Sequence, residues 1–330
     1  MKILVIGSNS YTGAAFVAHA LDRGHEVVGV SRSDELSPVF LPYRWGPPDS
    51  QKKFSFLRMD LNEKAEEIAR LARDRDLGYI ANFAAQSMVA ESWLTPAHWY
   101  QTNVVANVRL HEELRKWDGL KKYLHVTTPE VYGSCSGVVK EDAPFNPSTP
   151  YAASRAACDL HLQTFFKRYN FPVVFTRAAN VYGPGQQLYR ILPRAALFAR
   201  IGKKLPLHGG GHSTRAFIHG EDVASASLAI LQQGTRGEVY HLSTDRFISI
   251  RDLVAMVAKK TGTTFAKLAE VTADRPGKDA AYLLDSTKAK KQFAWTPRIG
   301  LEEGVDSVIR WIDENLAFLR GFPDHYIHKP

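Results

Sequence analysis

The sequence predicts an α/β protein with a doubly wound parallel sheet and a smaller C-terminal α+β lobe. Three observations support this fold class. Short β-branched runs alternate with helical segments in the first half, a glycine-containing turn follows the first run, and after about Asn180 mixed pieces rich in Gly and Pro replace the alternation. Continuous apolar strands separated by helices are typical of a parallel sheet covered on both faces. The expected arrangement of the first half is therefore the Rossmann fold.

The expected elements follow one another in a regular order. Short runs rich in Val, Ile and Leu predict strands, and longer segments with helical spacing of apolar residues predict helices. Strands are expected at 2–6, 25–30, 54–59, 79–83, 122–127 and 173–177. Helices are expected at 14–23, 65–75, 96–117 and 151–169. The segment 322–330 has no periodic pattern and is expected to be a loose tail.

Composition and charge narrow the classes of function. The 330 residues are 45% hydrophobic and 23% charged, as in an ordinary globular protein with a sizeable core. The formal net charge is +8, but Lys and Arg are dispersed without an arginine-rich arm or zinc-finger spacing, so no nucleic-acid partner is expected. The histidines show no paired-ligand spacing, so no metal is expected either.

Cysteine content and the first residues bear on location. Cys135 and Cys158 are too few for a disulfide framework, which favours a reducing compartment. The opening MKILVIG enters a predicted strand directly, and no uninterrupted apolar run is long enough to cross a bilayer. We therefore expect a cytoplasmic protein without a signal peptide or a membrane partner.

A phosphate-binding turn is predicted between the first strand and the first helix. Gly7 permits a tight turn, and Gly13 lets the helix and the strand approach closely. Ser10 stands where a middle glycine is common, and its hydroxyl is a candidate donor to a phosphate. The amides and the positive dipole end of the helix suit a pyrophosphate. The cofactor-binding residues expected in this turn are Gly7, Asn9, Ser10, Tyr11, Thr12 and Gly13.

The end of the second strand bears on which dinucleotide binds. An acidic residue there binds the ribose 2′-hydroxyl of NAD and repels the 2′-phosphate of NADP. This sequence has Ser31, Arg32 and Ser33 instead, and a cation flanked by hydroxyls favours NADP over NAD. Either cofactor would be held by the same turn.

The ends of the third and fourth strands complete the expected cofactor site. Asp60 and Leu61 are placed to meet the adenine, and Phe83, Ala84 and Ala85 lie beside the cofactor. Residues 1–180 thus form the expected dinucleotide-binding domain, and 181–330 mainly a substrate-binding lobe. Within that lobe, about 217–242 is a candidate to return to the Rossmann sheet.

Further motifs resemble the extended short-chain dehydrogenase/reductase family that acts on nucleotide sugars. The resemblance covers nearly the whole chain, and it rests on the number and order of the motifs. It implies an NAD(P)-dependent enzyme, a nucleotide-diphosphate sugar as substrate, and a homodimer assembled through the helices at 96–117 and 151–169. The motifs are NFAA (82–85), TN (102–103), TTPEVYG (127–133), YAASR (151–155), RAANVYGP (177–184), RAFIHGED (215–222) and RPGKD (275–279).

The resemblance assigns the redox centre to Thr128, Tyr151 and Arg155. A phenol with a pKa near 10 is a poor base until a nearby cation and the charge of the cofactor favour the phenolate. Tyr151 and Arg155 are one helical turn apart and share a face, and Thr128 is expected to hydrogen-bond the same oxygen. The family has lysine where this chain has Arg155, and arginine keeps the charge but not the shape.

Glu130 separates the reaction types within that family. The resemblance implies that a glutamate here removes the C5 proton once C4 is a ketone, as in 4,6-dehydratases, whereas simple C4-epimerases usually lack it. Pro129 stands where many dTDP-glucose 4,6-dehydratases carry an aspartic acid, but the GDP-mannose dehydratases also lack that aspartate. The leading interpretation is an NDP-hexose 4,6-dehydratase that regenerates its cofactor. A C4-epimerase, a UDP-uronate decarboxylase and, because of Arg155, a non-catalytic dinucleotide-binding regulator are the alternatives.

The remaining site residues also follow from the resemblance. Asn103 is expected near the cofactor, and the RPGKD run most resembles that of dTDP-glucose 4,6-dehydratases. Arginine side chains suit phosphate oxygens because their donors form a planar fork. The expected substrate-binding residues are Gln86, Thr128, Glu130, Asn180, Arg215 and Arg275.

Overall fold

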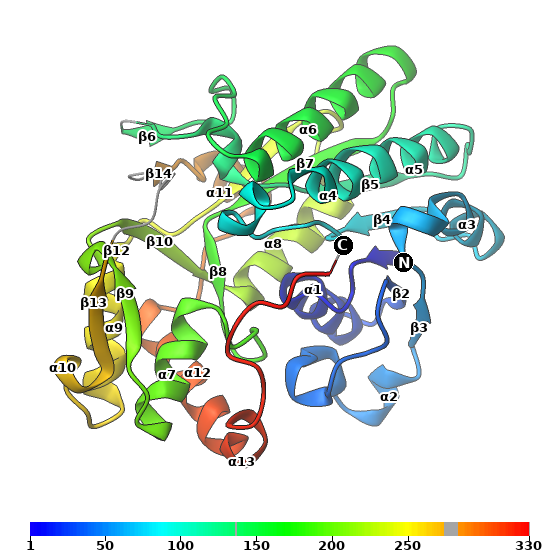
Figure 1. Cartoon of the computed structure of the whole chain (residues 1–330). Coiled ribbons are helices and arrows are strands. Elements are labelled where there is room, and N and C mark those ends of the chain that lie inside the picture. The colour runs from blue at the N-terminus through cyan, green and yellow to red at the C-terminus, as the bar shows by residue number, and fades with distance from the viewer. Residues whose placement is uncertain (136, 274–282, 330) are drawn as a thin grey trace.

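The computed structural model describes residues 1–135, 137–273 and 283–329. Its centre is a seven-stranded sheet in the order β11-β7-β5-β4-β1-β2-β3, and every pair of neighbours is parallel (Figure 1). The predicted doubly wound fold is therefore confirmed. The strands are β1 (Lys2–Ile6), β2 (Glu26–Ser31), β3 (Phe54–Arg58), β4 (Tyr79–Asn82), β5 (Lys122–Val126), β7 (Val173–Ala178) and β11 (Val239–Leu242).

Helices cover both faces of this sheet because successive strand residues point to opposite sides. Ile3 and Val5 pack in one core cluster with α1 (Tyr11–Asp22) and α8 (Gly220–Gln233). Leu4 and Ile6 pack in another with the helices of the opposite face. Those helices are α3 (Leu61–Asp74), α5 (Ala106–Leu114) and α6 (Pro150–Tyr169).

The helix expected at 96–117 is interrupted and shorter than predicted. It begins as α4 (Pro96–Tyr100), continues through a π-helical segment η4 (Gln101–Val105), and ends as α5 at Leu114. The π segment coincides with a polar cluster, since the buried Asn107 donates through Nδ2 to the carbonyl oxygens of Thr102 and Asn103. Single π turns inside α-helices are frequent at functional sites.

The C-terminal lobe has its own apolar core and small sheets. Its larger sheet has the order β12-β10-β8, and β9 pairs with β13. The helices that enclose this core are α7 (Ile191–Ile201), α9 (Ile250–Lys260) and α12 (Leu301–Glu314). The strands are β8 (Asn180–Tyr182), β9 (Leu205–His208), β10 (Thr214–His219), β12 (Phe247–Ser249) and β13 (Ala269–Thr272).

Shorter elements complete the described chain. They are α2 (Pro48–Gln51), β6 (Val138–Val139), α10 (Phe265–Leu268), β14 (Leu283–Leu284), α11 (Thr287–Phe293) and α13 (Leu316–Leu319). After α13 the described chain runs without helix or strand from the C-terminal lobe back to the Rossmann domain (Figure 1). Within the described ranges, no helix combines the length and apolar character needed to span a bilayer.

Candidate active site

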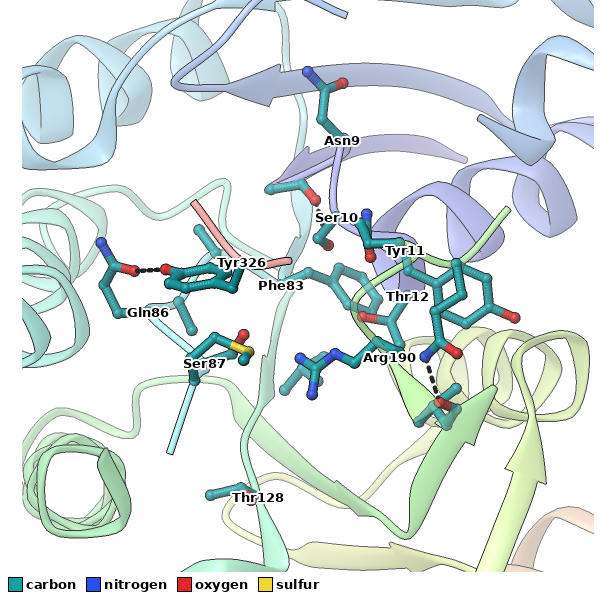
Figure 2. A pocket seen from close by; sticks show the side chains of 18 of the residues that line it. Asn9, Ser10, Tyr11, Thr12, Phe83, Gln86, Ser87, Thr128, Arg190 and Tyr326 are labelled. Atoms are coloured by element: carbon teal, nitrogen blue, oxygen red, sulfur yellow. Dashed lines mark hydrogen bonds between the residues drawn. The ribbon is translucent and has the colours of Figure 1, made fainter. Parts of the chain in front are cut away.

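A cavity of about 810 Å³ lies at the carboxyl ends of the parallel strands, between the Rossmann domain and the C-terminal lobe. The strand order reverses between β1 and β4, and ligands of open α/β sheets bind at such a switch point. Figure 2 shows residues of the first turn, of the loop after β4 and of the C-terminal lobe around one space. Predicted residues that line it are Gly7, Asn9, Ser10, Tyr11, Thr12, Ser31, Arg32, Ser33, Asp60, Leu61, Phe83, Ala84, Ala85, Gln86, Thr128, Glu130, Tyr151, Arg155 and Asn180.

The turn after β1 has the close packing expected of a phosphate-binding loop. Gly7 has φ +83° and lies against the backbone of Ala84, so a side chain has neither the conformation nor the space it needs. A Cβ on Gly13 would lie 2.3 Å from the carbonyl oxygen of Gly7. The turn therefore brings the N-terminus of α1 close to the end of β1, where its amides face the cavity.

Ser10 has a structural role that the sequence did not indicate. Its hydroxyl donates to the carbonyl oxygen of Gly7 at 2.7 Å and accepts from the amide of Gly13 at 3.1 Å, which caps α1. Serine is a favoured N-cap because its oxygen satisfies an amide that the helix leaves unpaired. The hydroxyl proton is thus used within the turn and is not directed to a phosphate.

Asn9 connects the turn to the end of β2. Its side-chain amide donates to the carbonyl oxygens of Ser33 at 3.1 Å and Asp34 at 3.0 Å, and its backbone amide donates to the hydroxyl of Ser31 at 3.0 Å. At the end of β3, Asp60 caps α3 by accepting from the amide of Asn62 at 2.9 Å. These bonds hold the strand ends that were predicted to meet the adenosine.

Two helix starts bring the predicted catalytic side chains together. Thr149 caps α6, and Pro150 occupies the first helical position, where its missing N–H costs nothing. Tyr151 therefore enters the cavity from the first turn of α6, and its exposed fraction is only 8%. Thr128 caps the short 3₁₀ helix η5 (Pro129–Tyr132) by accepting from the amide of Glu130. Pro129 fits its position for the same reason as Pro150.

The pKa of Tyr151 departs from the sequence expectation. Burial raises it above the usual value, and the carboxylate of Glu130 raises it further. Arg155, a hydrogen bond with Thr128 and Arg190 all lower the pKa, but they do not outweigh the burial. The prediction that a nearby cation favours the phenolate is therefore right in direction for Arg155, but these side chains alone do not produce it.

Arg155 is 2% exposed, and its guanidinium has donors that no described residue accepts from. Its Nη2 donates to the carbonyl oxygen of Val126 at the end of β5. Among the described residues, its Nε and Nη1 have no hydrogen-bond partner. Buried donors without partners are costly, and Arg155 lines the cavity, which makes its side chain a candidate to bind ligand oxygens.

Two carboxylates occur among the described residues that line the cavity. Asp60 caps α3 at the β3 end, whereas Glu130 is close enough to Tyr151 to raise its pKa. Glu130 is thus the carboxylate at the predicted reaction centre. Because Pro129 has no titratable group, no second acid comes from that position.

Some predicted residues lie outside the cavity wall. Gly13, Asn103 and Arg215 are not among the residues that line the cavity, and Arg215 lies on β10. Arg275 falls outside the described residues. Asn103 is fully buried and accepts from the amide of Gln86 at 2.8 Å. It also donates to the carbonyl of Gln86 and to the hydroxyl of Ser154. Asn103 therefore fixes the loop after β4 to α6.

Sequence reasoning missed several residues of the wall. Tyr189 and Arg190 precede α7, and Figure 2 shows Arg190 reaching into the same space as Thr12 and Phe83. No spacing rule connects residue 190 to Tyr151, because the two come together only when the C-terminal lobe packs against the Rossmann domain. Residues after α13 also form part of the wall, although their sequence has no regular pattern.

A buried ion pair lies beneath the catalytic helix. Asp159 on α6 and Arg177 on β7 are 2.8 Å apart, and both side chains are fully buried. Thr127 donates to the same carboxylate at 3.1 Å. Burial and then the charge of Arg155 keep the pKa of His125 well below its usual value, so Arg177 is the cation that pairs with Asp159.

Comparisons with known proteins agree with this geometry. The family model described as GDP-mannose 4,6 dehydratase matches residues 4–308. The dTDP-glucose 4,6-dehydratase of Streptomyces niveus is 30% identical over 324 residues, which cover 96% of this chain and 94% of that protein. A crystal structure of DesIV, the dTDP-glucose 4,6-dehydratase of Streptomyces venezuelae with NAD and TYD bound, has a TM-score of 0.87 at 29% identity and covers 96% of this chain and 98% of that one.

One longer relative matches only in part. The trifunctional UDP-glucose 4,6-dehydratase/UDP-4-keto-6-deoxy-D-glucose 3,5-epimerase/UDP-4-keto-L-rhamnose-reductase RHM3 of Arabidopsis thaliana is 29% identical over 318 residues. The match covers 95% of this chain but 47% of that protein, so the chain spans about half of its length. The resemblance predicted from the motifs is confirmed, and the chain belongs to the GDP-mannose 4,6-dehydratase family.

Proposed function

We propose that this protein is an NAD(P)-dependent nucleotide-sugar 4,6-dehydratase that makes a 4-keto-6-deoxy sugar. The observation that carries the proposal is the meeting of Tyr151, Thr128, Arg155 and Glu130 in one cavity with the glycine turn. The activities of the S. niveus and S. venezuelae relatives are of the same kind.

The cavity fits a nicotinamide dinucleotide. The turn at Gly7 leaves room for close approach to the amides of α1. The guanidinium donors of Arg155 that have no partner among the described residues suit ribose hydroxyls. Such a cofactor supplies a hydride acceptor that can later return the hydride. NADP is proposed over NAD because Arg32 lies between Ser31 and Ser33 at the adenosine end, although the S. venezuelae relative binds NAD.

Tyr151 is the proposed base for the sugar C4 hydroxyl. It takes the hydroxyl proton while the C4 hydride leaves, and Thr128 holds the same oxygen by a hydrogen bond. Because burial and Glu130 keep the pKa of Tyr151 high, positive charge must be added for this step. Arg155, Arg190 and the oxidised nicotinamide are the available positive charges.

Glu130 is the proposed acid and base for the elimination. Once C4 is a ketone, the C5 hydrogen is acidic and the carboxylate removes it. The C6 hydroxyl then leaves as water, and the same carboxyl group can give its proton to that leaving group. The hydride then returns to C6, and C5 takes a proton from solvent, which balances the C4 hydroxyl proton that Tyr151 took and releases to solvent. The reaction therefore involves no net oxidation. Pro129 takes no part in this proton transfer.

The proposed contacts to the sugar nucleotide come from the C-terminal lobe. Asn180 and Arg190 line the cavity and can donate to sugar or phosphate oxygens. Arg215 lies on β10 two residues from the cavity-lining Phe217, and alternate strand residues share a face. Arg215 is therefore proposed to meet the far end of the substrate, together with Arg275 from the family motif.

The test is incubation of the purified protein with a panel of NDP-hexoses and NDP-uronates. We expect a 4-keto-6-deoxy product with no net change of the dinucleotide. Accumulation of only the C4-inverted sugar would instead identify an epimerase, and carbon dioxide from a UDP-uronate would identify a decarboxylase. Mass spectrometry of nucleotides that co-purify with the protein would identify the cofactor and the base.

An Arg155→Lys variant tests the alternative of a non-catalytic regulator. If Arg155 supports the chemistry, the native protein itself turns over, and substitution by lysine brings no large gain in rate. A silent native protein that gains turnover through this substitution would support lost catalysis. Dinucleotide binding by both proteins, followed by fluorescence, serves as the control.

We also propose a cytoplasmic homodimer formed through α4, η4 and α6. These helices pack side by side, and Tyr100, Val105 and Leu160 on them are 40%, 45% and 52% exposed. Large apolar side chains exposed on neighbouring helices are candidates for an association surface. Leu160→Glu should shift the mass measured by light scattering to that of a monomer, whereas Val271→Glu, at an exposed position on β13, should not. An unchanged mass for Leu160→Glu would contradict this interface.

A further inference from the structure

The segment after α13 crosses the cavity rather than hanging loose. The aromatic ring of Phe322 lies 4.8 Å from that of Phe40, and Asp324 pairs with Lys203 at 2.9 Å. His328 is stacked 5.1 Å from the ring of Trp99 on α4. The segment thus begins on the C-terminal lobe and ends on the Rossmann domain, as Figure 1 shows. The expectation of a loose tail is wrong for residues 322–329.

Side chains of this segment alternate in their exposure. Asp324, Tyr326 and His328 are partly buried, whereas the residues between them are exposed. This is the pattern of an extended chain with one face against the protein. We call residues 322–329 the strap. The sequence did not predict its contacts, because a single extended segment can pack against the protein without a regular pattern of apolar residues.

The strap contacts the residues predicted to hold the dinucleotide. The carbonyl oxygen of Lys329 accepts from Nε2 of Gln86 at 2.6 Å and from Nη1 of Arg32 at 3.1 Å. The hydroxyl of Tyr326 donates to Oε1 of Gln86 at 3.4 Å, a contact that Figure 2 marks with a dashed line. One strap therefore joins the end of β2 to the loop after β4, between which a Rossmann cofactor lies.

The strap is a wall of the cavity and does not fill it. Tyr326 and Lys329 line the same space of about 810 Å³ as Gly7 and Arg155. Sites for small molecules and cofactors have volumes of about 300–1,000 Å³. The space beneath the strap is therefore large enough for a dinucleotide while the strap is in place.

Lys329 also adds charge at the adenosine end. Its Nζ lies 3.4 Å from the hydroxyl of Ser33. Arg58 donates to the backbone carbonyl of Arg32 at 3.3 Å and pairs with Asp34 at 3.2 Å. The cations of Arg32, Arg58 and Lys329 thus lie around the end of β2, together with the carboxylate of Asp34. A phosphate on the adenosine ribose would find complementary charge there.

We propose that residues 322–329 form a cover that retains the dinucleotide and that Lys329 is a specificity residue for the adenosine 2′-phosphate. The proposal rests on the proposed function, in which the hydride returns to the sugar and the cofactor need not leave between turnovers. Slow release then has no cost for turnover. A cover that joins the end of β2 to the loop after β4 would make the release of the dinucleotide slow.

The first experiment is removal of the strap beyond its anchor. Deletion of residues 325–330 keeps the Phe322–Phe40 contact and the Asp324–Lys203 pair. Release of bound NADPH and NADH, followed by fluorescence after mixing with excess oxidised cofactor, should be faster by about tenfold or more, because several contacts are lost. Unchanged release, or tighter binding after the deletion, would overturn the proposal; tighter binding would identify an autoinhibitory segment.

Point variants keep the test independent of folding. Lys329→Ala should weaken NADPH binding by about tenfold and NADH binding much less, because only NADPH carries the 2′-phosphate. Lys329→Arg should preserve the preference, and added salt should reduce it. Lys259→Ala, at an exposed lysine of α9, is the matched control. Equal losses for both cofactors would remove the specificity role of Lys329.

The two proposals fail in different ways. A native protein that binds neither NADPH nor NADH would contradict the proposed function itself. A native protein that binds them and releases them at the same rate with and without residues 325–330 would contradict only the cover. Tyr326→Ala, which removes the contact with Gln86, should accelerate release in the same direction as the deletion.

Discussion

At the scale of single residues, the site depends on charges held close together. As the proposed base, Tyr151 has to lose its proton inside a buried pocket, and the carboxylate of Glu130 opposes that loss by raising the pKa of Tyr151. In the proposed mechanism the same carboxylate later removes the C5 proton. The two steps thus make opposing demands on the electrostatics, and the cations at Arg155 and Arg190 favour the first of them.

This opposition predicts a pH effect for Glu130→Gln. Tyr151 acts as a base only when deprotonated, so a raised pKa makes C4 oxidation faster as the pH increases. Removing the Glu130 charge lowers the pKa of Tyr151, and the pH profile of C4 oxidation should therefore move to lower pH. Formation of the 4-keto-6-deoxy product should fall by about 10²–10⁴-fold, since the C5 base is lost.

Single-turnover absorbance of the reduced dinucleotide measures the C4 oxidation step, and product analysis measures the elimination. Glu63→Gln, at an exposed carboxylate of α3, is the control and should change neither. An oxidation profile with the same midpoint in Glu130→Gln and native protein would show that the two groups are not coupled.

At the scale of elements, the turn between β1 and α1 fixes where the cofactor lies. Gly13→Ala should disrupt it, because the new Cβ would lie 2.3 Å from the Gly7 carbonyl oxygen and 2.8 Å from the Ser10 hydroxyl. Overpacking of this kind costs about 1–3 kcal/mol. Thermal unfolding and dinucleotide titration should show lower stability and weaker binding.

Gly321→Ala is the control for that prediction, since its nearest neighbour would be 3.8 Å away. If Gly13→Ala bound the dinucleotide as tightly as Gly321→Ala, the turn would not set the position of the pyrophosphate. The other element-scale feature is the π segment in the helix from Pro96 to Leu114, which holds Asn103 and hence the loop at Gln86.

At the scale of the whole molecule, the buried ion pair between Asp159 and Arg177 connects α6 to β7 of the central sheet. Asp159→Asn should lower the free energy of unfolding by about 3–5 kcal/mol, because Arg177 would be left as a buried unpaired cation. Denaturant unfolding measures this change. Asp49→Asn, whose partner Lys52 is on the exposed surface, should have little effect.

The double variant Asp159→Leu with Arg177→Met separates pairing from packing. It removes both charges at once, and such replacements are often neutral or stabilising. Recovery of stability in the double variant would assign the loss in Asp159→Asn to the orphaned cation. A double variant as unstable as the single one would instead point to lost packing.

Much of this molecule follows from local sequence. The alternation of apolar runs and helical segments determined the parallel sheet, because burial on both faces demands that pattern. Gly7 and Gly13 were readable because a tight turn and a close helix–strand contact require them. Thr128, Tyr151 and Arg155 were assigned by the family resemblance, and the spacing of the last two then placed them on one helix face.

Tertiary structure alone decided the rest. Arg190 comes near Tyr151, Asp159 meets Arg177, and the strap reaches Gln86 only when distant segments pack. The interruption of the helix after Tyr100 and the use of the Ser10 hydroxyl within its own turn were likewise hidden. Periodicity records which face of an element is buried, whereas these contacts depend on what lies opposite that face, and a pattern within one element does not contain that information.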